Sequence, residues 1–452
     1  MKIIGFRVIC VIGIITLFSF ITFVHAGEQP VAIFHAFDQS YDDVATYVCD
    51  LPSQGYSHIQ IAPAQKSNPD KHWWARYQPV DYGVIEGMGS ENGLKSLISK
   101  AHGCGIKVIA DVVFNHMANM PEYKELNYPG LSKEDFHLPK CDINYSDGNR
   151  ESEINCWLGG LPDLDQDKKP VQEIQKAHLK KLLDLGIDGF RFDAAKHISP
   201  DILKNYIDYV DKESKGNTWN YLEVIEDKDT GAESYKWIAA VTDFILYKSM
   251  LAAFGFGGDL RSLKVPVAVD DPRSVTFGRN HDTVPANNDN CIVGCYGDAS
   301  DSYLATTYVL AREQGTPLVL NWDNYDSPFI RYGVKFRRIM NQRAKSGEIV
   351  KESVLGVVDN PNVMVMERGS QGFFVVNKGS DRFDVPVLDM TPSSLEGCYR
   401  ELRRNFTVAI ERRNDGKKYV TQWGRWSRGG LEVYSREALY FIREPWEQCT
   451  AR

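Results

Sequence analysis

The chain has 452 residues, a formal net charge of −8 and 12% aromatic residues. This length suits a large enzyme domain with an appended smaller domain rather than one small domain. The negative charge provides no basic surface for nucleic acid, so we expect no nucleic-acid partner.

The first 26 residues have the pattern of a secretory signal peptide. Lys2 and Arg7 supply a positive start, residues 8–24 are almost wholly apolar, and "VHA" ends at Ala26 with small residues suited to cleavage. The alternative is an uncleaved membrane anchor, because the apolar run is about long enough to span a bilayer. The cleavage-like ending favours removal, so we expect a secreted protein, extracellular or periplasmic, that has no membrane contact once the signal is removed.

Eight of the nine cysteines remain after residues 1–26 are removed. An even number in an exported chain predicts disulfides, although sequence alone does not fix the pairing. Cys141 with Cys156 and Cys291 with Cys295 are near neighbours, and Cys49 with Cys104 and Cys398 with Cys449 would complete four bridges. No CxxC spacing of a thiolate zinc site is present in the sequence.

From residue 31 onward, short apolar strands alternate with amphipathic helices. We expect strands over 31–37, 58–64, 107–115, 188–195, 220–226, 239–245, 274–282 and 315–321, with helices that include 40–55, 93–105 and 170–186. A β-α-β-α rhythm indicates a parallel sheet, and about eight strands is the number that closes a (β/α)₈ barrel. The rhythm is interrupted between residues 117 and 160 by a polar, cysteine-containing stretch.

After about residue 348 the pattern changes to strands joined by turns. We expect strands over 362–369, 372–379, 399–402, 406–423 and 431–444, with "NDG" at 414–416 as a hairpin turn. The predicted domains are a signal peptide (1–26), a barrel in two parts (27–116 and 164–350), an inserted domain (117–163) and a C-terminal β-sandwich (351–452).

Acidic and basic residues gather at the ends of the predicted barrel strands, where barrel enzymes place their chemistry. Asp193, Glu223 and Asp282 lie on three separate strands that would face one mouth. In "GFRFDAAKH" (189–197), strand alternation puts Arg191 beside Asp193, and an arginine there would favour the ionised carboxylate. For one such pair taken alone, a structural ion pair is the commoner interpretation. Crowded carboxyls also suit glycoside hydrolysis, which needs one ionised and one protonated group.

Four motifs together resemble the signature segments of the α-amylase family of glycoside hydrolases. They are "DVVFNH" (111–116), "GFRFDAAKH" (189–197), "EVIE" (223–226) and "NHD" (280–282), in order and at strand ends. The resemblance covers nearly the whole mature chain and is closest to animal-type and related bacterial α-amylases, through "WWARYQPV" and the cysteines near 141 and 156.

The resemblance implies a role for each matching residue. It makes Asp193 the nucleophile, Glu223 the general acid and then base, and Asp282 the group that holds substrate hydroxyls. Lys196 would contact sugar on the leaving side, and Arg191 would keep Asp193 ionised. The remaining sugar contacts would be Trp73, Trp74, Tyr77, Gln78, His116 and His281, the aromatic rings stacking on sugar faces.

The resemblance also implies a structural calcium ion bound by Asn115, Asp163 and the backbone carbonyl of His197, with a further carbonyl near Ile154. Amide, carboxylate and carbonyl oxygens suit this hard cation. The alternative for Asp163 is a turn or helix-capping residue. Many animal-type members bind chloride, but the third ligand position aligns with Leu318, which cannot coordinate an anion, so we do not expect chloride activation.

The function that the resemblance implies is a secreted, monomeric, retaining endo-hydrolase of α-1,4-glucans such as starch or glycogen. One alternative is a related transglycosylase or an oligosaccharide-directed hydrolase, because acceptor choice depends on loops. Another is a catalytically inactive carbohydrate-binding barrel, which the presence of all three acids disfavours. A simple adhesive carbohydrate-binding module would have the aromatic residues without the acids.

Overall fold

The computed structural model describes residues 27–146, 149–228, 230–269, 272–284, 291, 293–323, 325–355, 359–385, 393–422 and 430–450. The predicted signal peptide, residues 1–26, lies outside the described residues. Within the described ranges, none of the helices combines the length and the apolar character needed to cross a membrane.

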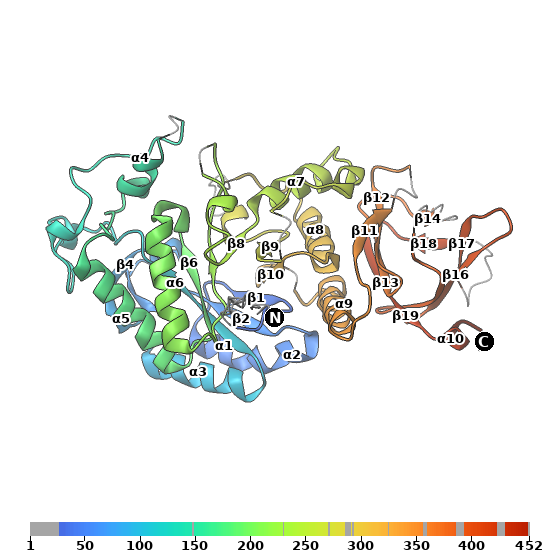
Figure 1. Ribbon diagram of the computed structural model, residues 1–452, viewed down its shortest axis with the longest axis horizontal. Coiled ribbons are helices and arrows are strands. Elements are labelled where there is room, and N and C mark those ends of the chain that lie inside the picture. Colours follow the sequence, from blue (N-terminus) through green and yellow to red (C-terminus); the bar gives the residue numbers. More distant parts are fainter. Residues whose placement is uncertain are drawn as a thin grey trace, which may run out of the picture.

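Eight parallel strands close into a barrel (Figure 1), which confirms the predicted (β/α)₈ fold. The strands follow the order β1-β10-β9-β8-β7-β6-β5-β2 around the barrel. Their bounds are β1 Ile33–Ala36, β2 His58–Ile61, β5 Lys107–Val113, β6 Gly189–Asp193, β7 Tyr221–Leu222, β8 Ala240–Thr242, β9 Ser274–Thr276 and β10 Thr316–Leu320. Since all pairs are parallel, the carboxyl ends of the strands meet at one mouth.

Helices follow the barrel strands and cover its outside. They are α1 Tyr41–Tyr47, α2 Leu51–Gln54, α3 Glu91–Gly103, α5 Lys169–Leu185, α6 Pro200–Ser214, α7 Phe244–Phe254, α8 Ala299–Ala311 and α9 Pro328–Lys345. The predicted single helix over 40–55 is wrong, because a 3₁₀ turn at Val48–Asp50 divides it into α1 and α2. Pro52 lies in the first turn of α2. It has no N–H to continue the ladder from α1, which explains the break.

Two insertions build the mouth of the barrel. After β2, the hairpin of β3 (Gln65–Ser67) and β4 (Pro79–Ile85) carries a 3₁₀ helix, Trp73–Tyr77, between its strands. After β5, the chain forms short 3₁₀ helices and one short helix, α4 (Arg150–Asn155), before it returns to α5. The sequence pattern predicted the second insertion as an interruption but gave no sign of the β3–β4 hairpin.

The C-terminal part is antiparallel, as predicted. A seven-stranded sheet has the order β11-β12-β13-β19-β15-β16-β17, and β14 pairs with β18 beside it. A short last helix, α10 (Glu447–Thr450), follows the sheet. The strands are β11 Glu352–Leu355, β12 Val363–Arg368, β13 Gly372–Asn377, β14 Phe383–Val385, β15 Gly397–Glu401, β16 Thr407–Arg412, β17 Lys418–Gln422, β18 Leu431–Val433 and β19 Glu437–Glu444.

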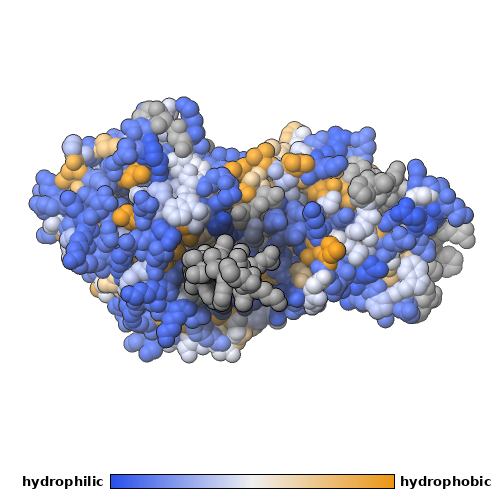
Figure 2. Space-filling model, in the orientation of Figure 1, coloured by the Kyte–Doolittle hydropathy of each residue, from blue (hydrophilic) through white to orange (hydrophobic). Residues whose placement is uncertain are grey.

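One hydrophobic core joins the barrel to this sheet. Phe336 and Met340 of α9 are buried with Phe374 of β13 and Tyr440 of β19. The face in Figure 2 is mostly hydrophilic, with hydrophobic residues in small groups, one of them over α7. Exposed Phe256, Val265 and Val267 follow α7 in the chain.

All four predicted disulfides are present. They join Cys49 to Cys104, Cys141 to Cys156, Cys291 to Cys295 and Cys398 to Cys449. The second closes the insertion after β5, and the fourth ties α10 to β15.

Candidate active site

Three acids from three barrel strands lie at the mouth of the barrel. Asp193 ends β6, Glu223 directly follows β7, and Asp282 lies in the 3₁₀ turn His281–Thr283 after β9. All three line one cleft of about 660 Å³. The structure therefore brings the three predicted acids together.

Arg191 connects two of these acids, Asp193 and Glu223, with a further acid, Asp111. Its Nη1 lies 2.7 Å from an oxygen of Asp111 and 2.9 Å from Oδ1 of Asp193, and its Nη2 forms an ion pair with Glu223. Arg191 is buried and does not line the cleft. One guanidinium is thus shared among three carboxyl groups.

This sharing changes the electrostatic expectation for Asp193. Burial, together with the neighbouring Glu223, raises the pKa of Asp193 well above its ordinary value, although Arg191 acts in the opposite direction. Burial and Glu223 raise the pKa of Asp282 in the same way. Asp193, Glu223, Asp282 and Asp111 are four carboxyl groups around one guanidinium, so their mutual repulsion opposes full ionisation of the cluster.

Neutral histidine and aromatic rings form one wall of the site. Tyr77 stacks on His281 with ring centroids 5.4 Å apart, and Phe37 stacks on the same histidine at 4.7 Å. Trp73 packs edge-on against both Tyr77 and His281. Burial and then Arg191 lower the pKa of His281 well below its ordinary value, so this ring is neutral.

Two buried polar atoms in this wall have no hydrogen-bond partner among the described residues. They are Nδ1 of His281 and Oδ2 of Asp282. A buried polar atom without a hydrogen bond costs free energy. A polar ligand in the cleft that supplies the missing hydrogen bond removes this cost, so these atoms are suited to bind one. Sugar hydroxyls, which both donate and accept, match such a pair.

His116 and Lys196 line the cleft but already have protein partners. Nε2 of His116 lies 2.9 Å from the carbonyl of Tyr77, and burial lowers the pKa of His116 to about 4. A neutral His116 ring that donates its Nε2–H to this carbonyl can offer a ligand only the acceptor nitrogen Nδ1. Lys196 donates to the carbonyl of Ile225, pairs with Asp227 and lies over the ring of Tyr145.

Other lining residues were not singled out from the sequence. Besides Gln78 and Trp74, which were expected, the cleft is lined by Tyr145, Leu158, Leu161, Ile225, Glu226, Asp227, Lys248 and Val293. They come from the inserted segment, from the loops after β7 and β9 and, for Lys248, from α7. Ile225 and Glu226 are part of the motif "EVIE", whereas the others have no motif signal and only long-range packing reveals them.

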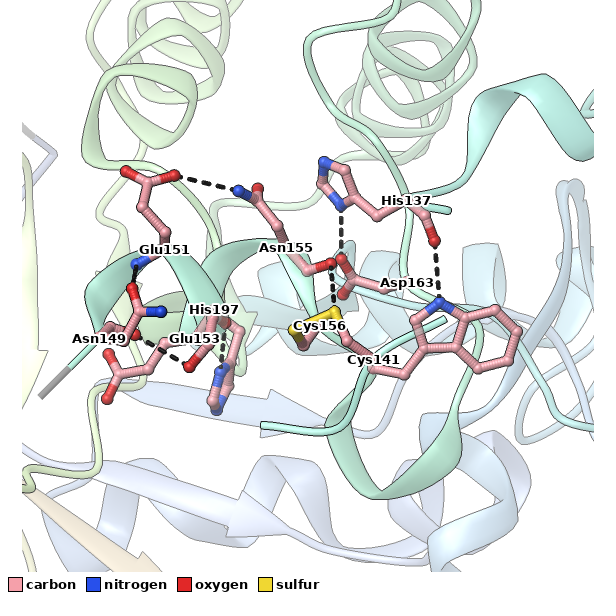
Figure 3. The surroundings of a disulfide bond; sticks show 11 residues. His137, Cys141, Asn149, Glu151, Glu153, Asn155, Cys156, Asp163 and His197 are labelled. Atoms are coloured by element: carbon pink, nitrogen blue, oxygen red, sulfur yellow. Dashed lines mark hydrogen bonds and ion pairs between the residues drawn. A yellow bond between two sulfur atoms is a disulfide. The ribbon is translucent and has the colours of Figure 1, made fainter. Parts of the chain in front are cut away.

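Of the residues expected to hold calcium, Asn115 and Asp163 come from neighbouring segments after β5, whereas His197 lies in the 3₁₀ turn Ala195–His197 after β6. Leu164 N donates to the carbonyl of Asn115 at 3.0 Å, and the backbone of Asp163 bridges that of His116. Figure 3 shows His137 pointing at Asp163, with Nδ1 2.6 Å from Oδ2. The ring of His197 contacts the carbonyl of Glu153, next to Ile154, at 2.9 Å.

These residues fit a hard cation. Within the described chain, Oδ1 of Asn115 and Oδ1 of Asp163 are buried and accept no hydrogen bond. Burial also raises the pKa of Asp163 to about 7, although His137 acts in the opposite direction. No cluster of three or more His, Cys, Asp or Glu side chains suited to a metal occurs in the described ranges. Any cation here would therefore rely on amide and carbonyl oxygens as well as Asp163.

Leu318 lies in β10, where its buried side chain packs in the core that also contains Val275 of β9. An aliphatic side chain offers no donor or charge for an anion.

A parallel eight-stranded barrel with a cluster of buried carboxyl groups at the carboxyl ends of its strands has the architecture of a barrel enzyme. Residues 46–253 match the family described as α amylase, catalytic domain. An α-amylase of Aeromonas hydrophila is 31% identical over 404 residues, which cover 76% of this chain and 84% of that protein. The chain belongs to the α-amylase family of glycoside hydrolases.

Animal relatives are similar as well. An α-amylase of the beetle Phaedon cochleariae is 29% identical over 322 residues, 65% of each chain. The solved structure of α-amylase I from Eisenia fetida in complex with maltohexaose has the same fold, with a TM-score of 0.72 and 20% identity over 91% of this chain and 99% of that one.

Proposed function

We propose that this protein is a secreted α-amylase that hydrolyses internal α-1,4-glucosidic bonds of starch or glycogen with retention of configuration. The observation that carries the proposal is the meeting of Asp193, Glu223 and Asp282 at one cleft around Arg191. Retaining glycosidases need one carboxylate as nucleophile and one carboxyl as proton donor.

Asp193 attacks the anomeric carbon and forms a covalent glycosyl-enzyme. As the glycosidic C–O bond breaks, Glu223 gives its proton to the departing oxygen, and afterwards it accepts a proton from the water that cleaves the intermediate. The raised pKa of Asp193 and Asp282 reflects the repulsion among neighbouring carboxyl groups, which disfavours a cluster with every group ionised. Asp282 and the free Nδ1 of His281 are suited to bind hydroxyls of the sugar that reacts.

The substrate class follows from the aromatic wall. Tyr77, Trp73 and half-exposed Trp74 present flat rings to the cleft, and such rings pack on the apolar faces of glucose units. Gln78 also lines the cleft, and Lys196, which lines it too, would contact the sugar on the leaving side. The maltohexaose bound to the Eisenia fetida enzyme supports an α-glucan substrate.

A structural calcium ion would be held by Asn115, Asp163 and the carbonyl of His197. It would supply positive charge to the buried Asp163 carboxylate and fix the insertion against the barrel. Four disulfides support export to an oxidising compartment. The protein would work as a monomer.

A transglycosylase is the second candidate. Leu158, Leu161, Ile225 and Val293 make part of the cleft apolar. An apolar lining favours binding of the apolar face of an acceptor sugar over binding of water. This observation therefore favours transfer of the glycosyl group to a sugar over hydrolysis.

The test is release of reducing ends from soluble starch by the mature protein, with products sized over time and their anomeric form followed by NMR. We expect early mixed maltooligosaccharides in the α form. Asp193→Asn should lower kcat/KM by more than about 1,000-fold, because the nucleophile is lost. The control Asp208→Asn changes an exposed residue of α6 and should keep wild-type activity.

Three results would contradict the proposal. Products that begin in the β form would mean inversion, and rearranged glucans without new reducing ends would mean transfer. No change in starch at all would mean an inactive barrel.

A further inference from the structure

We propose that Trp322 is an additional sugar-binding ring that contacts long α-glucan chains beyond the catalytic cleft. The proposal rests on the function above and extends the site past Phe37. Trp322 does not line the cleft itself, and its ring is 42% exposed.

Trp322 lies on the catalytic face of the barrel. It follows β10 by two residues, and β10 pairs with β1 on one side and β9 on the other. The segments after β1 and β9 carry Phe37 and His281. Trp322 therefore extends from the same mouth as Asp282.

A chain of ring contacts connects Trp322 to the site. Its ring meets Phe37 edge-on at 4.9 Å, and Phe37 stacks on His281 at 4.7 Å and lies 5.4 Å from Trp73. Phe37 is fully buried, so Trp322 is the exposed end of this row. A saccharide bound beside His281 reaches Trp322 only if it is long enough to pass Phe37.

The loop that carries Trp322 is held firmly on both sides. Asn321 bonds to the backbone N–H and carbonyl of Phe37 through its side-chain amide. On the other side, buried Asp323 pairs with Arg279 and accepts a hydrogen bond from Thr306.

Arg279 completes the support, because its Nη2 donates to the carbonyl of Trp322 at 2.8 Å. It precedes Asn280, which caps the turn that carries Asp282. The exposed ring is thus fixed relative to a catalytic acid, and a ring fixed in advance loses little entropy when it binds.

Exposure by itself would not identify a site, because Trp237 and Trp446 are also exposed. No ring contact joins either of them to the aromatic row among the described residues. Trp446 is 41% exposed and lies in the C-terminal domain, so it is a matched control for Trp322.

The experiment compares kcat/KM for maltoheptaose with kcat/KM for maltotriose in wild type, Trp322→Ala, Trp322→Leu, Trp322→Phe and Trp446→Ala. Trp322→Ala and Trp322→Leu should lower the ratio of the two constants by about tenfold, since a stacked aromatic contact is worth roughly that factor. Trp322→Phe should largely restore the ratio, and Trp446→Ala should keep the wild-type value.

The proposal would be overturned if Trp322→Ala or Trp322→Leu melted at the same temperature as wild type and kept the wild-type ratio of the two kcat/KM values. Calorimetric binding of maltoheptaose in a Glu223→Gln background gives a readout without turnover, and Trp322→Ala should weaken it by about tenfold. If wild type cleaves neither saccharide, the proposed function fails, and this binding measurement alone decides whether Trp322 holds a glucan.

Discussion

Arg191 is the residue on which the electrostatics of the site depend. Its two terminal nitrogens serve Asp111, Asp193 and Glu223 at once, and its side chain is almost completely buried. A planar guanidinium can divide its donors in this way, whereas an ammonium group concentrates its charge at one point.

We predict that Arg191→Lys lowers kcat/KM on starch by about 100-fold with the fold retained, since the charge remains but the donors no longer reach all three carboxyls. Activity assays and melting curves check this. As a control, Arg338→Lys on α9 changes an exposed arginine that donates to the carbonyl of Pro52. Equal losses in both variants would contradict a specific role for Arg191.

Asp243 is a buried acid outside the catalytic cluster. It caps α7 by accepting from Leu246 N at 2.8 Å, and it also accepts from Val269 N at 3.1 Å. Burial raises the pKa of Asp243 from 3.8 to about 6. The folded protein therefore prefers the protonated form more than the unfolded chain does.

The contribution of Asp243 to the free energy of unfolding therefore falls as the pH rises. The stability that Asp243 contributes is complete below about pH 4 and is lost as pH rises through about 6, in total about 3 kcal/mol. Asp243→Asn cannot titrate, so wild type should lose about 3 kcal/mol more of its unfolding free energy than the variant between pH 4 and 7. Urea denaturation at several pH values measures the difference, and parallel curves for the two proteins would refute the prediction.

At the scale of elements, the insertion after β5 has little regular structure of its own. Its segments are held together by the Cys141–Cys156 disulfide and by contacts such as His137 with Asp163. Such a segment depends on cross-links, because it cannot bury enough apolar surface alone.

We predict that EDTA destabilises the wild-type protein by about 2–3 kcal/mol, because it would remove the calcium ion that we propose at Asn115 and Asp163. Asp163→Ala should be less stable than wild type and should not respond to EDTA. Asp142→Ala, an exposed change in the same insertion, should respond as wild type does. Melting curves with and without EDTA provide the measurement, and a wild type that is insensitive to EDTA would exclude the calcium site.

At the scale of the whole molecule, the C-terminal sheet is tied to the barrel by buried charges as well as by apolar packing. Lys378, next to β13, donates to the carbonyls of Ala253, Gly255 and Gly258 at the C-terminus of α7. Arg368 of β12 donates to the carbonyls of Ala311 and Arg312, at the end of α8. Positive groups at helix C-termini satisfy carbonyls that the helix leaves unpaired.

We predict that Lys378→Met lowers the free energy of unfolding by about 3 kcal/mol, because buried carbonyls lose charged donors. Lys417→Met, in the exposed β16–β17 hairpin, should change it by less than about 0.5 kcal/mol. Thermal and urea unfolding of the two variants test this, and similar small effects in both would show that the contact between the domains does not depend on Lys378.

The barrel, the antiparallel C-terminal part and the position of Asp193, Glu223 and Asp282 at strand ends could all be predicted from the sequence. These features follow from local patterns, because alternation and helix periodicity fix strands and helices, and parallel strands bring their carboxyl ends to one mouth.

The interactions among these groups, in contrast, could not be predicted from the sequence. The β3–β4 hairpin, the sharing of Arg191 and the link from Phe37 to Trp322 join residues far apart in the chain. The same holds for the pKa of Asp193, which an adjacent arginine alone would lower but which burial and other carboxyls raise. Burial and charge crowding are sums over residues that meet only in the folded protein, so no local pattern contains them.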